Sequence, residues 1–140
     1  MIRRADSQSG QPFAIWLIEL LPQDHAIASG LILIPADYAR QKARLVDCVV
    51  EESAQLMGLP NDSDRVFPSV FSDVTVDTWL SPLDYVLLKM LYAPELSPGM
   101  SAAQVRAALP AVIQRLAERG ELSHAIRRVR QGSLREWAGD

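Results

Sequence analysis

Polar side chains that could carry out acid–base or metal chemistry are concentrated in one short segment of the chain. Glu51 and Gln55 are four residues apart, so on a helix they lie on the same face. Glu52 lies beside them, and a carboxylate acts as a general base when it holds a water next to an electrophile. Asn61 and Asp62 follow shortly afterwards and add oxygen donors. The segment therefore predicts a polar site with one candidate base and several oxygen ligands.

The spacing of these residues is that of a zinc-binding protease helix. In that pattern two His residues four apart, and a third His after a Gly turn, hold the metal. Here Glu51, Gln55 and Asn61 occupy the three ligand positions, whereas Glu52 and Gly58 keep the base and the turn. Zinc prefers nitrogen and sulfur donors, and oxygen donors suit harder ions. We therefore expect no cofactor, the alternative being a weakly bound divalent cation.

Other residues with metal-binding or nucleophilic side chains lie far from this segment in the sequence. His25 falls in a polar turn and His124 near the C-terminus, and we expect neither to bind a metal. Cys48 is the only cysteine, so no intrachain disulfide can form, and we expect a buried, inert thiol.

The N-terminal part of the chain is predicted to form a small sheet. The runs 13–20 and 28–34 are short and apolar and are followed by Pro22 and Pro35, which is typical of strands in a hairpin or side by side. Residues 1–12 are polar and contain Gly and Pro, so we interpret them as a flexible lead-in.

A long helix is expected to carry the acidic segment. Asp37 is a suitable N-cap, and Gly58 stands where a glycine commonly ends a helix. Apolar residues recur at helical spacing, which predicts a stripe that faces the core and a polar face opposite. The predicted stripe comprises Val46, Val49, Val50, Ser53, Ala54 and Met57, and the predicted polar face comprises Arg44, Cys48, Glu51, Glu52 and Gln55.

Two interpretations of the acidic residues stay open from the sequence. Glu51, Glu52 and Gln55 form either a solvated helix face or a retained functional cleft. Glu52 is either a base or a cap for backbone amides of the next loop. Asn61 and Asp62 are also ordinary turn formers, because their side chains bond to nearby backbone amides.

Capping signals predict two further helices. Ser81, Pro82 and Asp84 open the first, and Ser101 with Gln104 opens the second.

The second of these helices contains Pro110, which we expect to kink or split it, and Gly120 is expected to end it. Residues 121–140 form a basic tail in which a helix is one interpretation. The sequence thus predicts one α+β domain over residues 1–140, with its core in residues 13–120.

Composition excludes several classes of protein. The chain has 140 residues, of which 49% are hydrophobic and 22% charged, as in ordinary globular domains. A net charge of −3 argues against a nucleic-acid binder, and no apolar segment is long enough to span a membrane. Glu19 interrupts the apolar run from Phe13 to Leu21, so this run does not predict a signal peptide.

The order of segments over residues 28–116 resembles a bacterial family, domain-of-unknown-function family 2927. The resemblance is carried by residues 47–64, Ser69–Asp73, Leu80–Asp84 and Leu91–Met100. It implies an exported or envelope-associated protein.

The same order is similar to the catalytic half of a metzincin-type protease. Ser69–Phe71 would be the turn beneath the metal, with Phe71 where that pattern has Met, and Leu91 and Tyr92 would end the next helix. The resemblance implies a zincin-like fold, in which a small sheet packs on the motif helix and two or three helices follow.

Because all three ligand positions differ from the protease pattern, we interpret the chain as a catalytically degenerate zincin-like domain, a binding or structural module for a peptide or protein partner. The alternative is a working hydrolase in which Glu52 activates water beside a metal held by Glu51, Gln55 and Asn61 or Asp62. A third interpretation is an exported protein whose polar patch has no small-molecule role.

Overall fold

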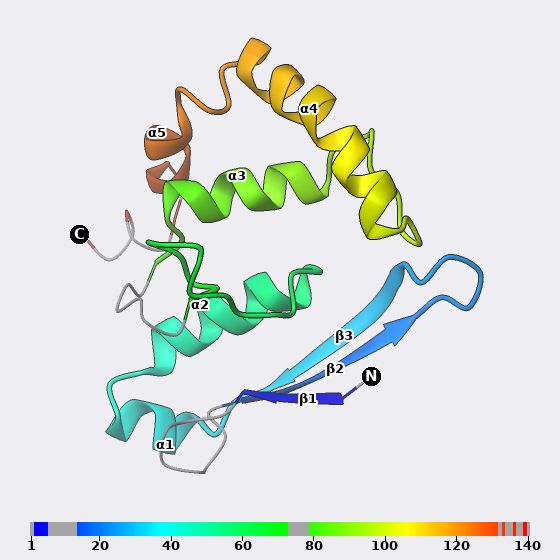
Figure 1. Ribbon diagram of the computed structural model, residues 1–140. Helices are drawn as coiled ribbons and strands as arrows, with labels where there is room; N and C mark the ends of the chain where they lie inside the picture. Colours follow the sequence, from blue (N-terminus) through cyan, green and yellow to red (C-terminus); the bar gives the residue numbers. More distant parts are fainter. Residues whose placement is uncertain are drawn as a thin grey trace.

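A computed structural model describes the backbone of residues 2–5 and, in full, residues 14–72, 79–131, 133, 136 and 139. The N-terminal part is a three-stranded antiparallel sheet, and helices follow it along the chain (Figure 1). The strands are β1 (Ile2–Ala5), β2 (Ala14–Leu20) and β3 (Ile27–Leu33), in the spatial order β1-β2-β3. The helices are α1 (Ala36–Gln41), α2 (Leu45–Leu56), α3 (Pro82–Leu91), α4 (Ala102–Glu118) and α5 (Ala125–Arg130).

The expected α+β class is confirmed, and both predicted strands are present as an antiparallel pair. The N-terminus differs from the prediction, because Ile2–Ala5, expected as part of a flexible lead-in, pair with β2 as a third strand. Ile2 lies opposite Leu17 in the register of this pair, and Ala5 lies opposite Ala14. The rest of the predicted lead-in, residues 6–12, lies outside the described residues.

One face of the sheet packs against α2. Trp16 and Ile18 of β2 are buried on this face, where Ile18 pairs with Gly30 of β3. Gly30 permits a close approach, since a Cβ there would lie 2.6 Å from the side chain of Leu56 in α2. The opposite face carries Leu31 and Leu33, which remain 50% and 52% exposed.

The single long helix predicted from Asp37 to Met57 is wrong, because the chain breaks it into α1 and α2. Pro35, not Asp37, is the N-cap, and Asp37 lies in the first turn of α1. Ala43 has a φ of 55°, and the amides of Ala43 and Arg44 bond to the carbonyls of Arg40 and Ala39. These two bonds form a Schellman motif with alanine at the left-handed position, where the sequence offers no glycine as a stop signal.

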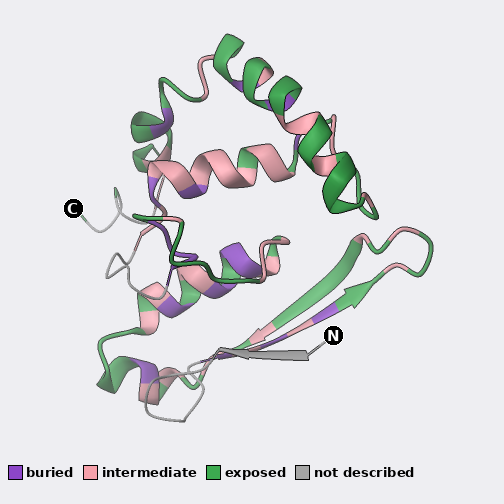
Figure 2. Cartoon of the chain, viewed as in Figure 1, coloured by how far each residue is buried: buried purple, intermediate pink, exposed green. Residues whose placement is uncertain are grey.

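The predicted faces of α2 are largely reversed. Cys48, Glu52, Ala54 and Gln55 are buried, whereas most of the predicted apolar stripe lies at the surface (Figure 2). The reason is that α2 is covered on two sides. The sheet contacts it near Leu56, and a cluster formed by Ala54 with Val70 and Phe71 covers another side. The exposed members of the predicted stripe are Val46, Val49, Ser53 and Met57.

The C-terminal helices begin as predicted. Ser81 and Ser101 both form complete capping boxes, with Asp84 and Gln104 as their partners. Of the two outcomes expected at Pro110, a kink or a split, the split does not occur, because α4 is one helix. Pro110 and Arg106 are both exposed, so water can bond to the carbonyl that loses its helical donor.

A polar cluster holds α5 against α3. The hydroxyl of Tyr85 donates to Oε2 of Glu121 at 2.5 Å. Lys89 and Arg128 lie 3.7 and 3.8 Å from the same carboxylate. Glu121 therefore binds both helices, and part of the predicted basic tail is an ordered helix. In the described part of the chain, no helix combines the length and apolar character needed to cross a membrane.

Candidate functional site

The chain reverses sharply after α2, and this turn places the loop that follows. Gly58 has a φ of 120°, and a Cβ there would lie 3.2 Å from the side chain of Leu91. The hydroxyl of Tyr92 donates to the carbonyl of Met57 at 2.6 Å and fixes the end of α2 to the end of α3. The predicted turn at Gly58 is thus confirmed, and a residue with a side chain would be strained there.

Glu52 is a buried carboxyl on the interior side of α2. Its side chain is 1% exposed, and Oε2 has no hydrogen-bond partner among the described residues. Burial, and to a smaller extent the negative charges of Glu51 and Asp62, together raise the pKa of Glu52 to about 7. Glu52 therefore holds a proton up to about neutral pH, which contradicts the solvated-face interpretation for this residue.

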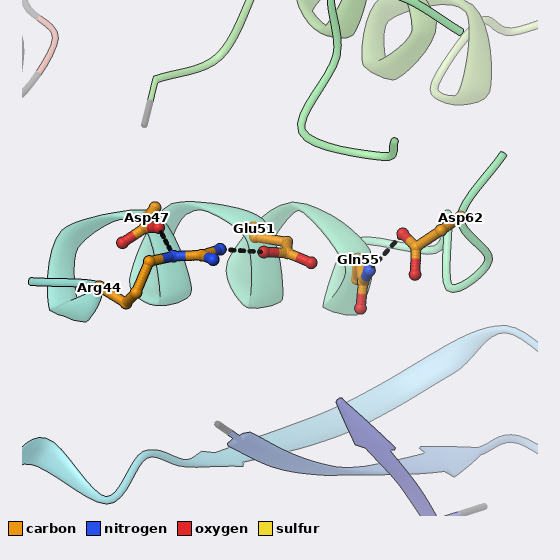
Figure 3. Close-up of polar contacts among 5 residues, drawn as sticks. All are labelled: Arg44, Asp47, Glu51, Gln55 and Asp62. Carbon is orange, nitrogen blue, oxygen red and sulfur yellow. Dashed lines mark hydrogen bonds and ion pairs between the residues drawn. The ribbon is translucent and has the colours of Figure 1, made fainter. Parts of the chain in front are cut away.

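Gln55 connects α2 to the loop beyond the turn. It is 4% exposed, and its Nε2 donates to Oδ1 of Asp62 at 2.8 Å (Figure 3). Figure 3 shows the two side chains pointing toward each other from the end of α2 and from the loop. The reversal of the backbone therefore brings Asp62 over the helix, as the motif spacing predicts. Asn61, the third predicted ligand, is exposed.

Glu51 interacts along the helix and not with Gln55. Nη2 of Arg44 lies 3.9 Å from Oε2 of Glu51, and Nε of Arg44 also contacts Oδ2 of Asp47 (Figure 3). The arginine thus compensates part of the negative charge on this side of α2. Two predicted ligands, Glu51 and Gln55, therefore have protein partners of their own.

The predicted ligand set is poor in charged donors. No group of three or more His, Cys, Asp or Glu side chains in the described part of the chain is arranged to hold an ion. Gln55 and Asn61 are neutral oxygen donors, which contribute weakly compared with carboxylates. The arrangement provides instead a buried carboxyl with a near-neutral pKa, next to two acidic residues.

A second buried carboxylate, Asp84, organises the turn that faces α2. It accepts hydrogen bonds from Oγ of Ser69 at 2.5 Å, from the amide of Val70 at 3.1 Å and from the amide of Ser81 at 2.7 Å. The capping role predicted for Asp84 is confirmed, and the bonds to Ser69 and Val70 are additional. Local spacing could not predict them, because Ser69 and Asp84 are fifteen residues apart.

The turn that Asp84 stabilises also contacts the loop that carries Asp62. Phe71 is buried in the cluster with Ala54 of α2, and its carbonyl accepts the amide of Ser63 at 2.7 Å. Asp62 is therefore positioned from both directions, by Gln55 before it and by Phe71 after it.

Cys48 lies one helical turn before Glu52 on the same buried side. It is a free, buried thiol, as expected. Burial raises its pKa to about 11, and the negative charge of Asp47 contributes in the same direction. The thiol is thus neutral and a poor nucleophile at physiological pH.

These features define a small α+β domain in which a helix with a buried carboxyl lies between a three-stranded sheet and a serine–aspartate turn. The sequence model of a family described as "Protein of unknown function (DUF2927)" matches residues 3–111. The chain belongs to this family, as its resemblance implied. The search of curated proteins and the search of solved structures each found no match. The resemblance to metzincin proteases stays a prediction.

Proposed function

We propose that this domain is a catalytically degenerate, zincin-like module that binds an extended segment of a peptide or protein partner along β3. The observation that carries the proposal is the open edge of β3. Within the described residues this strand pairs only with β2, and no backbone hydrogen bond joins its outer side to another element. An unpaired edge of this kind is a template for a further strand.

The side chains of β3 support the same function. All but one of its residues, Ile32, are exposed, and Leu31 and Leu33 present apolar surface on one face. In strand addition, main-chain hydrogen bonds supply affinity and pockets or patches for alternate side chains supply specificity. An extended peptide with apolar residues at alternate positions is therefore the partner that matches β3.

The state of the motif residues supports the degenerate character. Glu52 is almost fully buried, so a substrate does not reach it without a rearrangement. Gln55 is bonded to Asp62, and Arg44 neutralises part of Glu51. We infer that these residues now maintain the loop over α2 and do not bind an ion.

Selection from a displayed library of random ten-residue peptides tests the proposal. Selected peptides are expected to alternate apolar and polar residues, and to protect amides of β3 from hydrogen exchange. Leu31→Lys should abolish this binding, since a charge on the edge disfavours a further strand. Val49→Lys, on the exposed side of α2, is the matched control and should bind normally. Protection confined to other elements, or equal binding by both variants, would rule the edge out.

The competing function is a working hydrolase, and the pKa of Glu52 is the observation that favours it. A carboxyl with a pKa of about 7 is suited to general acid–base catalysis. Incubation of the selected peptides with the protein, followed by mass spectrometry, separates the two functions. Cleavage by the unmodified protein and not by Glu52→Gln would establish the hydrolase. Intact peptides that bind equally to both proteins support the module.

A further inference from the structure

The outer side of α5 borders a hollow that lies beyond the segment matched by the family, which ends at residue 111. The hollow has a volume of about 950 Å³, which is the size of small-molecule sites in proteins. His124, Arg127 and Arg130 are among the residues that line it. This surface is separate from α2 and β3 in the sequence and belongs to the C-terminal helix.

The basic side chains of the hollow share one face of the helix. His124, Arg127 and Arg130 follow one another at intervals of three residues, which brings them to the same side. The chain as a whole has a net charge of −3, so this concentration of positive charge is a local feature. Glu136 also lines the hollow, so one acidic residue borders it beside the three basic ones.

The third arginine of α5, Arg128, has a structural role and so differs from Arg127 and Arg130. Arg128 pairs with Glu121 and helps to hold α5 against α3. In the part of the chain that the structure describes, the guanidinium groups of Arg127 and Arg130 have no hydrogen bond or ion pair. Arg128 therefore helps to hold the helix in place, while Arg127 and Arg130 line the hollow and bond to no acceptor among the described residues.

We propose that this hollow binds a small molecule that carries an oxyanion, either phosphate or carboxylate, through Arg127 and Arg130. A guanidinium group offers a planar fork of N–H donors that matches two oxygens of such a group. Two forks at an interval of three residues on a packed helix provide a preformed clamp, and His124 adds a further donor beside them. Ile126, which is exposed at the same hollow, provides apolar surface for the body of the ligand.

Titration of the full chain with two probes, pyrophosphate and citrate, tests this proposal at constant ionic strength. The readout is the NMR signals of the His124 imidazole and of the α5 amides. We expect saturable shifts confined to α5 and its neighbours. Tighter binding of pyrophosphate identifies a phosphate ligand, and tighter binding of citrate identifies a carboxylate ligand.

Substitution separates a specific site from general attraction. Arg127→Gln and Arg130→Gln should each weaken binding by roughly tenfold, because each removes charge-assisted hydrogen bonds. Arg106→Gln, an exposed arginine on α4, is the matched control and should leave binding unchanged. Arg127→Lys keeps the charge without the fork and should also weaken binding. No saturable shift with either probe, or equal weakening by the α4 control, would overturn the proposal.

Discussion

Gln55 and Asp62 are joined by a hydrogen bond of 2.8 Å between Nε2 and Oδ1, across the chain reversal at Gly58. This bond places an acidic residue of the loop near the carboxyl of Glu52, whose pKa it helps to raise. The donor is almost fully buried, so its hydrogen bond cannot be replaced by bulk water without opening the loop. One side-chain pair thus sets both the course of the loop and the electrostatics beneath it.

The two sides of this pair can be tested separately. Asp62→Ala leaves the buried amide of Gln55 without its acceptor and should lower the free energy of unfolding by about 1–3 kcal/mol. Asp62→Asn keeps an acceptor oxygen in place and should cost less, while the pKa of Glu52 falls because a negative charge is removed. Urea denaturation and NMR titration of the Glu52 carboxyl measure the two effects. A stability loss in Asp62→Asn equal to that in Asp62→Ala would contradict the role assigned to the hydrogen bond.

The buried carboxyl of Glu52 predicts a stability that falls as pH rises. The ordinary pKa is 4.5 and the value in the folded protein is about 7, so between these values the folded state binds the additional proton. The free energy of unfolding therefore decreases from pH 4.5 to 7, by about 3 kcal/mol in total, and this contribution is constant above that range. The full stabilisation is present below pH 4.5.

Glu52→Gln supplies the control for this prediction, because glutamine has a similar shape and does not titrate. The decrease between pH 4.5 and 7 should be absent in the variant when urea denaturation is measured at intervals across this range. An identical pH profile in both proteins would assign the dependence to other groups. Glu51→Gln is the second control and should retain the decrease, with the pKa of Glu52 shifted downward.

The elements set by local chemistry could be predicted from the sequence. The apolar runs that became β2 and β3 and the capping boxes at Ser81 and Ser101 depend on residues close together in the chain. The turn at Gly58 is of the same kind. The interactions that form these features involve residues only a few positions apart. A local sequence pattern was therefore enough to predict them.

The elements set by distant contacts could not be predicted in this way. The periodicity of α2 favoured Val46 and Val49 for the interior, yet tertiary packing buries Cys48 and Glu52 instead. A helix that is covered on two sides buries a wide part of its surface. A single apolar stripe in the sequence does not show which residues that part contains. The bond from Ser69 to Asp84 is likewise created by the fold and leaves no local signal.

Asp84 is expected to be the most sensitive polar residue of the domain. It is fully buried and accepts from three donors, so Asp84→Ala would remove the acceptor of the Ser69 hydroxyl and of the amides of Val70 and Ser81. We expect a loss of about 3–5 kcal/mol in the free energy of unfolding, measured by urea denaturation. Asp37→Ala, at an exposed carboxylate of α1, is the control and should change stability by less than about 1 kcal/mol.

A smaller loss on Asp84→Ala would mean that the turn from Ser69 to Ser72 is held mainly by the packing of Phe71. Ser69→Ala addresses the same point with a smaller change. It removes one donor to Asp84 and the acceptor of the Phe71 amide, and it leaves the carboxylate bonded to two amides. That variant should lose about 1–2 kcal/mol.

The left-handed residue between α1 and α2 predicts a stabilising substitution. Ala43 has a φ of 55°, a conformation that costs an alanine about 1 kcal/mol and a glycine little. Ala43→Gly should therefore raise the free energy of unfolding by about 0.5–1 kcal/mol, although glycine also increases the entropy of the unfolded chain. Ala107→Gly, at an exposed position within α4, provides the matched control and should lower stability by about 1 kcal/mol. If both substitutions destabilise the protein alike, then Ala43 is not in a left-handed conformation. The prediction of one continuous helix in place of α1 and α2 would then be correct.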